Sequence, residues 1–211
     1  MATDVRLAGP DDVAAMAVSL GRAFGDDPIF EFLVPGVDPA ERARRATPFF
    51  TVDARIRVRT ASAWTTPDHV GGALWAPPGK WHTSLADGLR LAWPIVRGSR
   101  GRSFRALAAL STIEKVHPRR PHWYLAVLGT DPDHQGKGVG GALMAPVLER
   151  CDADGLAAYL ESSKESNIGY YERFGFRVER ELPLGKGAPS VWPMWREPQE
   201  SDSGPRPQPA E

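Results

Sequence analysis

The sequence is poor in cysteine, in long apolar runs and in net charge, and each shortage excludes a class of protein. Its 211 residues include one cysteine, Cys151, which excludes a disulfide framework and a four-cysteine zinc site. No apolar run approaches the roughly 18 residues that a membrane-spanning helix needs. The 26 Lys and Arg residues balance 26 Asp and Glu residues. A nucleic-acid-binding protein needs an excess of Lys and Arg, so we expect no such partner.

The first residues, MATDVRLAGPDDV, lack the basic-then-apolar pattern of a secretory signal. Together with the missing membrane span, this predicts a cytoplasmic protein that has no membrane partner. Charge is nevertheless unevenly distributed along the chain. Residues 1–40 carry 2 basic and 7 acidic side chains, whereas residues 80–120 carry 9 basic and 2 acidic side chains. A solvated helical surface explains such a run, and a local field that attracts an anionic ligand is the alternative.

Glycine and proline are abundant, with 21 and 20 residues, which indicates a chain of many short elements. Runs of β-branched and aromatic residues predict strands at 5–7, 61–65, 70–75, 123–128, 156–160, 176–182 and 190–195. Apolar residues at helical spacing predict a helix that starts at Asp11 or Asp12. The same spacing predicts further helices over 39–56, 84–97 and 103–117, from the glycines at 136–141 to about 154, and near 167–173. We expect one domain over residues 1–197, with a helical insertion at about 80–118, and a disordered tail at 198–211.

The most informative segment is GKGVGG at 136–141, which holds four glycines between a predicted strand and a predicted helix. Glycines at such a turn let backbone N–H groups approach a ligand closely. The helix N-terminus adds about half a positive charge, so a phosphate or pyrophosphate is the ligand that we expect. A tight turn without a ligand would need only one or two glycines.

Three phosphate-binding motifs compete for this segment. A Walker loop is excluded because Gly138, not Ser or Thr, follows Lys137. The dinucleotide pattern G-x-G-x-x-G fits 136–141, and Glu161 lies about 20 residues further on. However, about six residues separate the predicted strand from the glycines, and too little chain follows for a doubly wound sheet. The third motif is Q/R-x-x-G-x-G/A, which residues 135–140 match.

On this third motif the sequence resembles the GNAT N-acetyltransferases. The run NIGYYERFGF at 167–176 is similar to the second motif of that family. The likeness is strong over about 120–196 and weak over 36–118, where we expect the acceptor to be chosen. The resemblance implies an α/β fold with a mixed, mostly antiparallel central sheet flanked by helices. It also implies that acetyl-CoA is the acyl donor substrate and a primary amine the acceptor. The run DHQGKG at 133–138 is similar to a branch of the family that acetylates an antibiotic amine, which favours a small-molecule acceptor.

The resemblance also implies roles for individual residues. Tyr171 stands four residues before Gly175, as the general acid of the family does, whereas Tyr170 stands five before. Asn167 is a cofactor contact by the resemblance and a helix N-cap by residue type, and both roles are compatible. The donor is assigned to the glycine turn and the strand before it: Leu128, Thr130, Gln135, Gly136, Lys137, Gly138, Val139, Gly140, Gly141 and Asn167.

The general base and the acceptor pocket stay open. Glu161, at the end of a predicted strand, is either the base or half of a structural ion pair, for example with an arginine. Asp27 and Glu31 either line the acceptor pocket or are exposed loop charges. Three tryptophans could form an aromatic wall, although core packing is favoured for each: Trp75, Trp81 and Trp93.

No metal site is expected, because the five histidines lack ligand spacing, and Cys151 has the position of a packing residue. Transfer by direct attack follows, since no activated cysteine is present. Three other functions remain as alternatives: acetylation of a protein or peptide amine, non-catalytic binding of acyl-CoA, and, more remotely, a nicotinamide-dependent oxidoreductase. Either a monomer or a homodimer agrees with the sequence.

Overall fold

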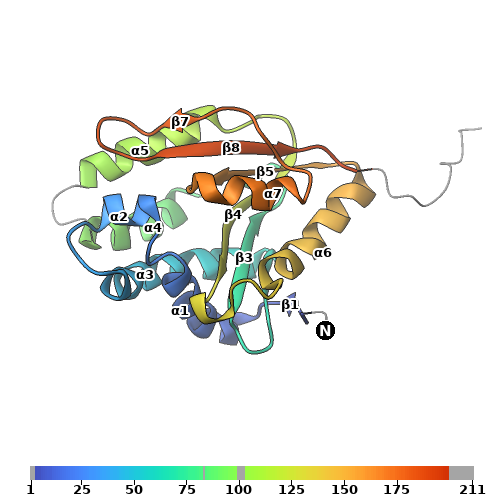
Figure 1. Cartoon of the computed structure of the whole chain (residues 1–211), viewed down its shortest axis with the longest axis horizontal. Helices are drawn as coiled ribbons and strands as arrows, with labels where there is room; N and C mark the ends of the chain where they lie inside the picture. Colours follow the sequence, from blue (N-terminus) through green and yellow to red (C-terminus); the bar gives the residue numbers. More distant parts are fainter. Residues whose placement is uncertain (1–2, 83, 99–102, 200–211) are drawn as a thin grey trace, which may run out of the picture.

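The computed structural model describes residues 3–82, 84–98 and 103–199, which form one sheet with helices on both faces (Figure 1). Most of the tail predicted at 198–211 lies outside these ranges. Within them, no helix is both long and apolar enough to cross a membrane.

The strands form a mixed sheet in the order β1-β2-β3-β4-β5-β8-β6, and β7 also pairs with β8. Neighbouring strands are antiparallel except for β4 and β5, which are parallel. This confirms the predicted mixed, mostly antiparallel sheet. The strands are β1 Arg6–Leu7, β2 Ala63–Thr65, β3 Gly71–Ala76, β4 His122–Thr130, β5 Ala157–Ser162, β6 Arg177–Val178, β7 Leu182–Pro183 and β8 Ser190–Arg196.

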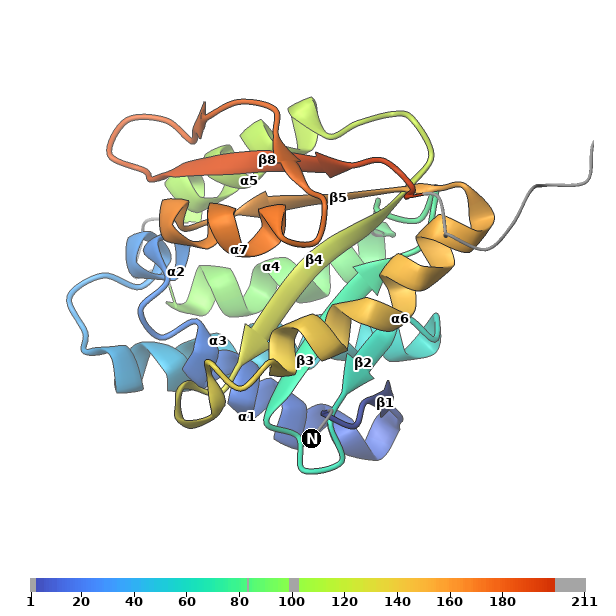
Figure 2. The same ribbon diagram turned by 45° about the vertical axis from the view of Figure 1, so that its right-hand side comes forward.

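Helices cover both faces of this sheet. Figure 2 shows α6 and α7 in front of it and α4 and α5 behind it. Two of the helices, α4 and α5, connect β3 to β4, where helices were expected from the apolar spacing. The helices are α1 Val13–Ala23, α2 Pro28–Leu33, α3 Pro39–Arg59, α4 Leu85–Gly98, α5 Ser103–Val116, α6 Val139–Asp154 and α7 Ile168–Glu172.

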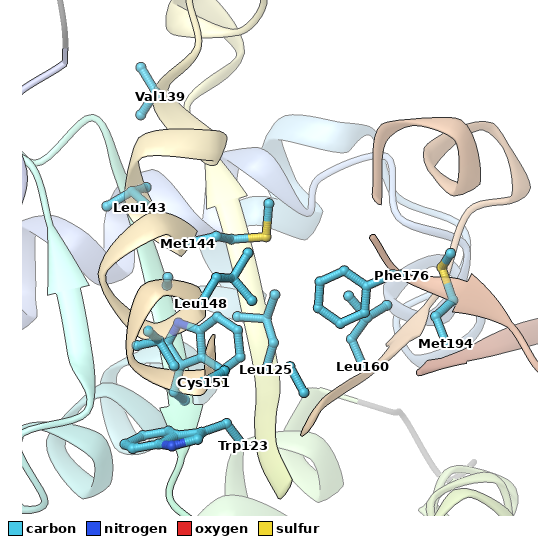
Figure 3. Packing of buried hydrophobic residues seen from close by; sticks show 14 residues of the cluster. Trp123, Leu125, Val139, Leu143, Met144, Leu148, Cys151, Leu160, Phe176 and Met194 are labelled. Carbon is cyan, nitrogen blue, oxygen red and sulfur yellow. The ribbon is translucent and has the colours of Figure 1, made fainter. Parts of the chain in front are cut away.

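The core beneath α6 fixes that helix against the central strands. Figure 3 shows Leu143, Met144 and Leu148 of α6 beside Trp123 and Leu125 of β4. Cys151 belongs to the same cluster and is fully buried. Burial raises the pKa of its thiol to about 12, so the sulfur is a packing group, as the sequence predicts. Because α6 is held along its length, its N-terminal turn is held in place beside the end of β4.

The feature that positions the site is an opening between β4 and β5. The β3–β4 register pairs Leu74 with Val127 and Trp75 with Leu125, which leaves Ala126 as an extra, bulged residue in β4. The β4–β5 pairing ends at the same point, with Leu125 opposite Leu160. From residue 126 to residue 130, β4 is therefore paired with β3 alone.

Three details differ from the sequence prediction. The strand expected at 176–182 is two short strands, because the exposed charged residues 179–181 separate β6 from β7. Asp12 precedes α1 but makes no side-chain cap, since its carboxylate is taken by Arg6, Gly9 and His69. Trp93 is 62 % exposed on α4 and so is not a core residue, whereas Trp75 is fully buried, which confirms the core packing favoured for it.

Close packing of α1 against β4 gives a prediction about stability. A Cβ atom at Gly129 would lie 2.9 Å from both Ala23 Cβ and Leu20 Cδ2. We expect Gly129→Ala to lower the free energy of unfolding by about 1–3 kcal/mol, because α1 must shift away from the sheet. Urea unfolding followed by circular dichroism measures the loss.

Gly169→Ala is the matched control, since a Cβ atom at Gly169 in α7 meets nothing within 4 Å. This control should leave stability unchanged or raise it, because alanine favours a helix. Equal losses in the two variants would contradict the packing explanation.

Candidate active site

The glycine turn between β4 and α6 has the geometry of a ligand-binding loop. Gly136 and Gly138 have φ angles of +76° and +82°, which side chains other than glycine rarely adopt. A Cβ atom at either position would meet nothing within 4 Å, so both glycines border open space. Gly138 is the N-cap of α6 and supplies no side-chain cap. The first N–H groups of α6 are thus available to an anion.

The other polar residues of this loop hold it to the strand before it. Gln135 donates from Nε2 to the carbonyl oxygen of Thr130 at 3.1 Å, and Lys137 donates from Nζ to that of Asp133 at 3.0 Å. The Val139 side chain is buried in the core with α6. The buried side chain of Val139 leaves only its backbone for the predicted contact with a ligand, whereas the side chain of Lys137 is exposed.

Gly140 and Gly141 allow α7 and the turn after it to approach α6 closely. A Cβ atom at Gly140 would lie 2.5 Å from the Tyr170 hydroxyl oxygen, and one at Gly141 would lie 2.9 Å from Phe174 Cζ. Packing between the helices therefore explains both glycines. Their predicted contact with a donor through the backbone stays a prediction.

Leu128 and Thr130 lie on the part of β4 that has lost its β5 partner. Backbone N–H and C=O groups there need hydrogen bonds from outside the sheet. An extended ligand with its own amide groups can supply them, as an added strand would. The open stretch of β4 runs directly into the glycine turn.

Tyr171 lies on α7, with its ring 6.1 Å from Phe176 and 5.3 Å from Tyr170, measured between centroids. Burial raises the pKa of Tyr171, and Tyr170 and Asp27 raise it further. The hydroxyl therefore keeps its proton at neutral and moderately alkaline pH and is suited to donate it. Asn167 stands at the start of α7, but its side chain makes no cap hydrogen bond, so capping does not account for it.

Asp27 closes one side of the site by a contact far along the chain. Its Oδ1 atom accepts from the N–H groups of Ile29 at 2.9 Å and Phe30 at 3.2 Å, and its Oδ2 atom accepts from the Ser163 hydroxyl. Asp27 is 3 % exposed, so it is not an exposed loop charge, and burial raises its pKa. Glu31, by contrast, has a side chain that is 67 % exposed.

The Glu161 side chain is 6 % exposed on β5, and its Oε1 atom has no hydrogen-bond partner. Among the described residues, the basic group within 4 Å is His117, whose Nδ1 atom is 3.6 Å from Oε1. The basic partner of Glu161 is thus a histidine rather than an arginine, and both sequence interpretations, the base and the structural ion pair, stay predictions. A buried carboxylate with an unsatisfied oxygen is suited to accept a proton or to bind a cation.

Four residues around Glu161 are absent from the sequence prediction of the site. They are His117, His122, Tyr124 and Tyr159, whose rings contact one another. The period of two along a strand could have indicated part of this cluster, because residues 122 and 124 of β4 and 159 and 161 of β5 alternate with core residues. Trp81 stacks on His117 with a centroid separation of 3.8 Å, so Trp81, unlike Trp75 and Trp93, contacts this cluster. Across the described residues, no cluster of three or more His, Cys, Asp or Glu side chains is arranged to hold a metal ion.

Comparisons with known proteins agree with this arrangement. Residues 79–176 match the model of the acetyltransferase (GNAT) family. An N-acetyltransferase of Schizosaccharomyces pombe, itself described as uncharacterised, is 30 % identical over 182 residues, which cover 82 % of this chain and 74 % of that protein. The L-methionine sulfoximine/L-methionine sulfone acetyltransferase of Pseudomonas aeruginosa is 37 % identical over 54 residues, or 24 % of this chain and 31 % of that one.

Solved structures share the fold at lower identity. The histone acetyltransferase HPA2 and related acetyltransferase of Corynebacterium glutamicum has a TM-score of 0.66 at 24 % identity, covering 96 % of this chain and 99 % of that one. The polyamine N-acetyltransferase of Drosophila melanogaster has a TM-score of 0.60 at 17 % identity, covering 93 % and 100 %. Together with the glycine turn and the open β4 strand, the family model and the yeast relative show that this chain belongs to the acetyltransferase (GNAT) family.

Proposed function

We propose that the protein transfers an acetyl group from acetyl-CoA to a primary amine of a small molecule by direct attack. The observation that carries the proposal is the stretch of β4 from residue 126 to residue 130, which lacks a β5 partner and leads into the glycine turn. A ligand with an extended, amide-containing arm that ends in a pyrophosphate fits this arrangement, because the arm can pair with β4 and the pyrophosphate can bind at the glycine turn.

Acetyl-CoA fits the residues around this opening. The backbone of Leu128 and Thr130 would pair with its amide-containing arm, and the N–H groups of 135–140 would bind its pyrophosphate. Asn167, which caps no helix, has an amide free for the same ligand. When bound, acetyl-CoA supplies the thioester that is attacked.

Tyr171 and Glu161 would handle the protons of the reaction. The raised pKa of Tyr171 keeps its proton available for the thiolate that leaves. Glu161 would accept a proton from the acceptor, since an amine attacks only in its neutral form. Burial of the Cys151 thiol supports direct attack, because this sulfur cannot carry the acetyl group.

Three observations favour a small acceptor. The Glu161 carboxylate is buried behind aromatic rings rather than set in an open peptide groove. The Pseudomonas relative is named for small amino-acid derivatives, and the run DHQGKG at 133–138 resembles puromycin N-acetyltransferase. An antibiotic-like amine is therefore the acceptor that we propose.

Binding of the donor gives the first test. Saturating acetyl-CoA should raise the melting temperature by about 5 °C or more, whereas NADPH should not, because stabilisation follows the ligand that the native state binds. Gly138→Ala should abolish this shift. Differential scanning fluorimetry measures it, and a shift with NADPH alone would contradict the proposal.

Gly155→Ala is the matched control for Gly138→Ala. Gly155 ends the same helix with φ +66°, and a Cβ atom there also meets nothing within 4 Å. Both substitutions should cost about 1–2 kcal/mol of backbone strain. Only Gly138→Ala should lose the acetyl-CoA shift, and equal loss in both would show that folding strain explains it.

The acid assignment predicts that Tyr171→Phe lowers kcat by about 10²–10⁴-fold, because the leaving thiolate loses its proton donor. Tyr170→Phe removes the neighbouring hydroxyl on the same helix and should keep most of the turnover. Thiol release from acetyl-CoA measures both rates. Full turnover in Tyr171→Phe would refute the assignment.

A panel of acceptors identifies the substrate class. Puromycin, 2-phenylethylamine, agmatine, L-methionine sulfone and a peptide with a free N-terminus represent the alternatives. We expect turnover with one or more of the small amines and none with the peptide, since Glu161 is buried. Turnover with the peptide alone would instead favour a protein acetyltransferase.

A further inference from the structure

Two buried histidines, His117 after α5 and His122 at the start of β4, contact each other ring to ring. Their Nε2 atoms lie 3.0 Å apart. His122 Nδ1 lies 2.6 Å from the carbonyl oxygen of Arg120. A carbonyl oxygen only accepts hydrogen bonds, so His122 carries a proton on Nδ1 and donates it to Arg120.

This tautomer determines the role of the neighbouring ring. Burial lowers the pKa of His122, so its ring is neutral at pH 7 and its Nε2 atom accepts a hydrogen bond. His117 therefore donates from its own Nε2 atom. Its Nδ1 atom is then the ring nitrogen without a hydrogen, and this atom faces Glu161 Oε1 at 3.6 Å.

In this tautomer, the Nδ1 atom of His117 and the carboxylate oxygen of Glu161 face each other as two acceptors. Their separation is longer than the roughly 2.7–3.2 Å of an N–H···O hydrogen bond, and Oε1 has no other partner. A proton donor that contacts Oε1 satisfies this atom, and the N–H groups of an ammonium ion are such donors.

Aromatic rings enclose this pair of acceptors. Trp81 stacks on His117, while Tyr124 and Tyr159 meet it edge-on at 4.7 and 4.9 Å between centroids. The Tyr159 hydroxyl is buried without a hydrogen bond of ordinary geometry, but it interacts with the Glu161 carboxylate, and burial together with that carboxylate raises the pKa of Tyr159. Aromatic faces attract cations, so the enclosure suits an organic ammonium ion. Further charged groups influence the tyrosines from neighbouring segments: Arg57 of α3, and Glu179 and Arg180 after β6.

We propose that Glu161, His117 and His122 form one proton-accepting unit for the acceptor amine, a proposal that rests on the acetyl transfer proposed above. Glu161 contacts the ammonium group and passes one proton to Nδ1 of His117, and His122 positions His117 through Nε2. The neutral amine nitrogen then bonds to the thioester carbon as the C–S bond breaks. Tyr171 gives its proton to the sulfur and regains one from the new amide nitrogen, and His117 later releases its proton to water.

Nitrogen-15 NMR of the histidine rings tests the unit in the protein without an acceptor. We expect the Nδ1–H tautomer at His122 and the Nε2–H tautomer at neutral His117. In Glu161→Gln the nitrogen-15 shift of His117 Nδ1 should change while the shifts of His122 stay the same, because the carboxylate no longer faces His117 Nδ1. An Nε2–H tautomer at His122, or a His117 Nδ1 signal that Glu161→Gln leaves unchanged, overturns the proposal.

Chemical rescue tests the unit during turnover, with the panel amine that is turned over fastest. We expect His117→Ala to lower kcat by about 10²-fold while the KM for acetyl-CoA is unchanged. Added imidazole should restore turnover, whereas pyrazole, which has the same shape but is a far weaker base, should not. Rescue by both compounds would show a packing role alone and overturn the proposal.

His82→Ala is the matched control, because His82 also stacks on Trp81 but has Glu114 as its acidic neighbour, at 3.7 Å. Its kcat and the effect of imidazole on it should equal those of the wild type. The two proposals fail in different ways. If the wild type acetylates no amine, the acetyl transfer is refuted. If the wild type acetylates an amine and His117→Ala does so with equal kcat, only the proton-accepting unit is refuted.

Discussion

The parallel contact between β4 and β5 covers four residue pairs, and the layout of the candidate site follows from where it stops. β5 goes on to pair with β8 as far as Ser162, whereas β4 bulges at Ala126 and continues beside β3. Unpaired backbone groups are costly unless a ligand or water satisfies them. The opening therefore has different groups on its two sides. The glycine turn at the end of β4 presents N–H donors, and Glu161 at the end of β5 presents a carboxylate.

Much of the fold was predictable because its signals are local. The glycines of 136–141 and the apolar spacing after them define α6 without knowledge of any contact, and the turn between β2 and β3 is equally plain in the sequence. The prediction fails at 176–182 because strand length there depends on pairing with β8. It also fails for Trp93, because a helix that covers the far side of a domain can leave a large apolar side chain in water.

The site was predictable only in part, for a different reason. Tyr171 and the glycine turn belong to contiguous motifs, whereas the surroundings of Glu161 come from separate segments. Alternation along β4 and β5 could have placed His122 and Tyr159 on one face, but no local pattern indicates that His117 folds back onto His122. Asp27 shows the same limit, because its bonds to Ile29 and Phe30 are local, whereas no local pattern indicates its bond to Ser163.

The bond between Asp27 and Ser163 joins residues that are 136 positions apart, and Lys164 forms an ion pair with Asp26 across nearly the same span. Contacts of this range form late, since the ends of a long loop must be brought together first. During synthesis, the first helices emerge long before the segment that fastens them. A nascent chain, or one shortened before residue 163, therefore lacks the two contacts that hold residues 26 and 27 to the segment after β5.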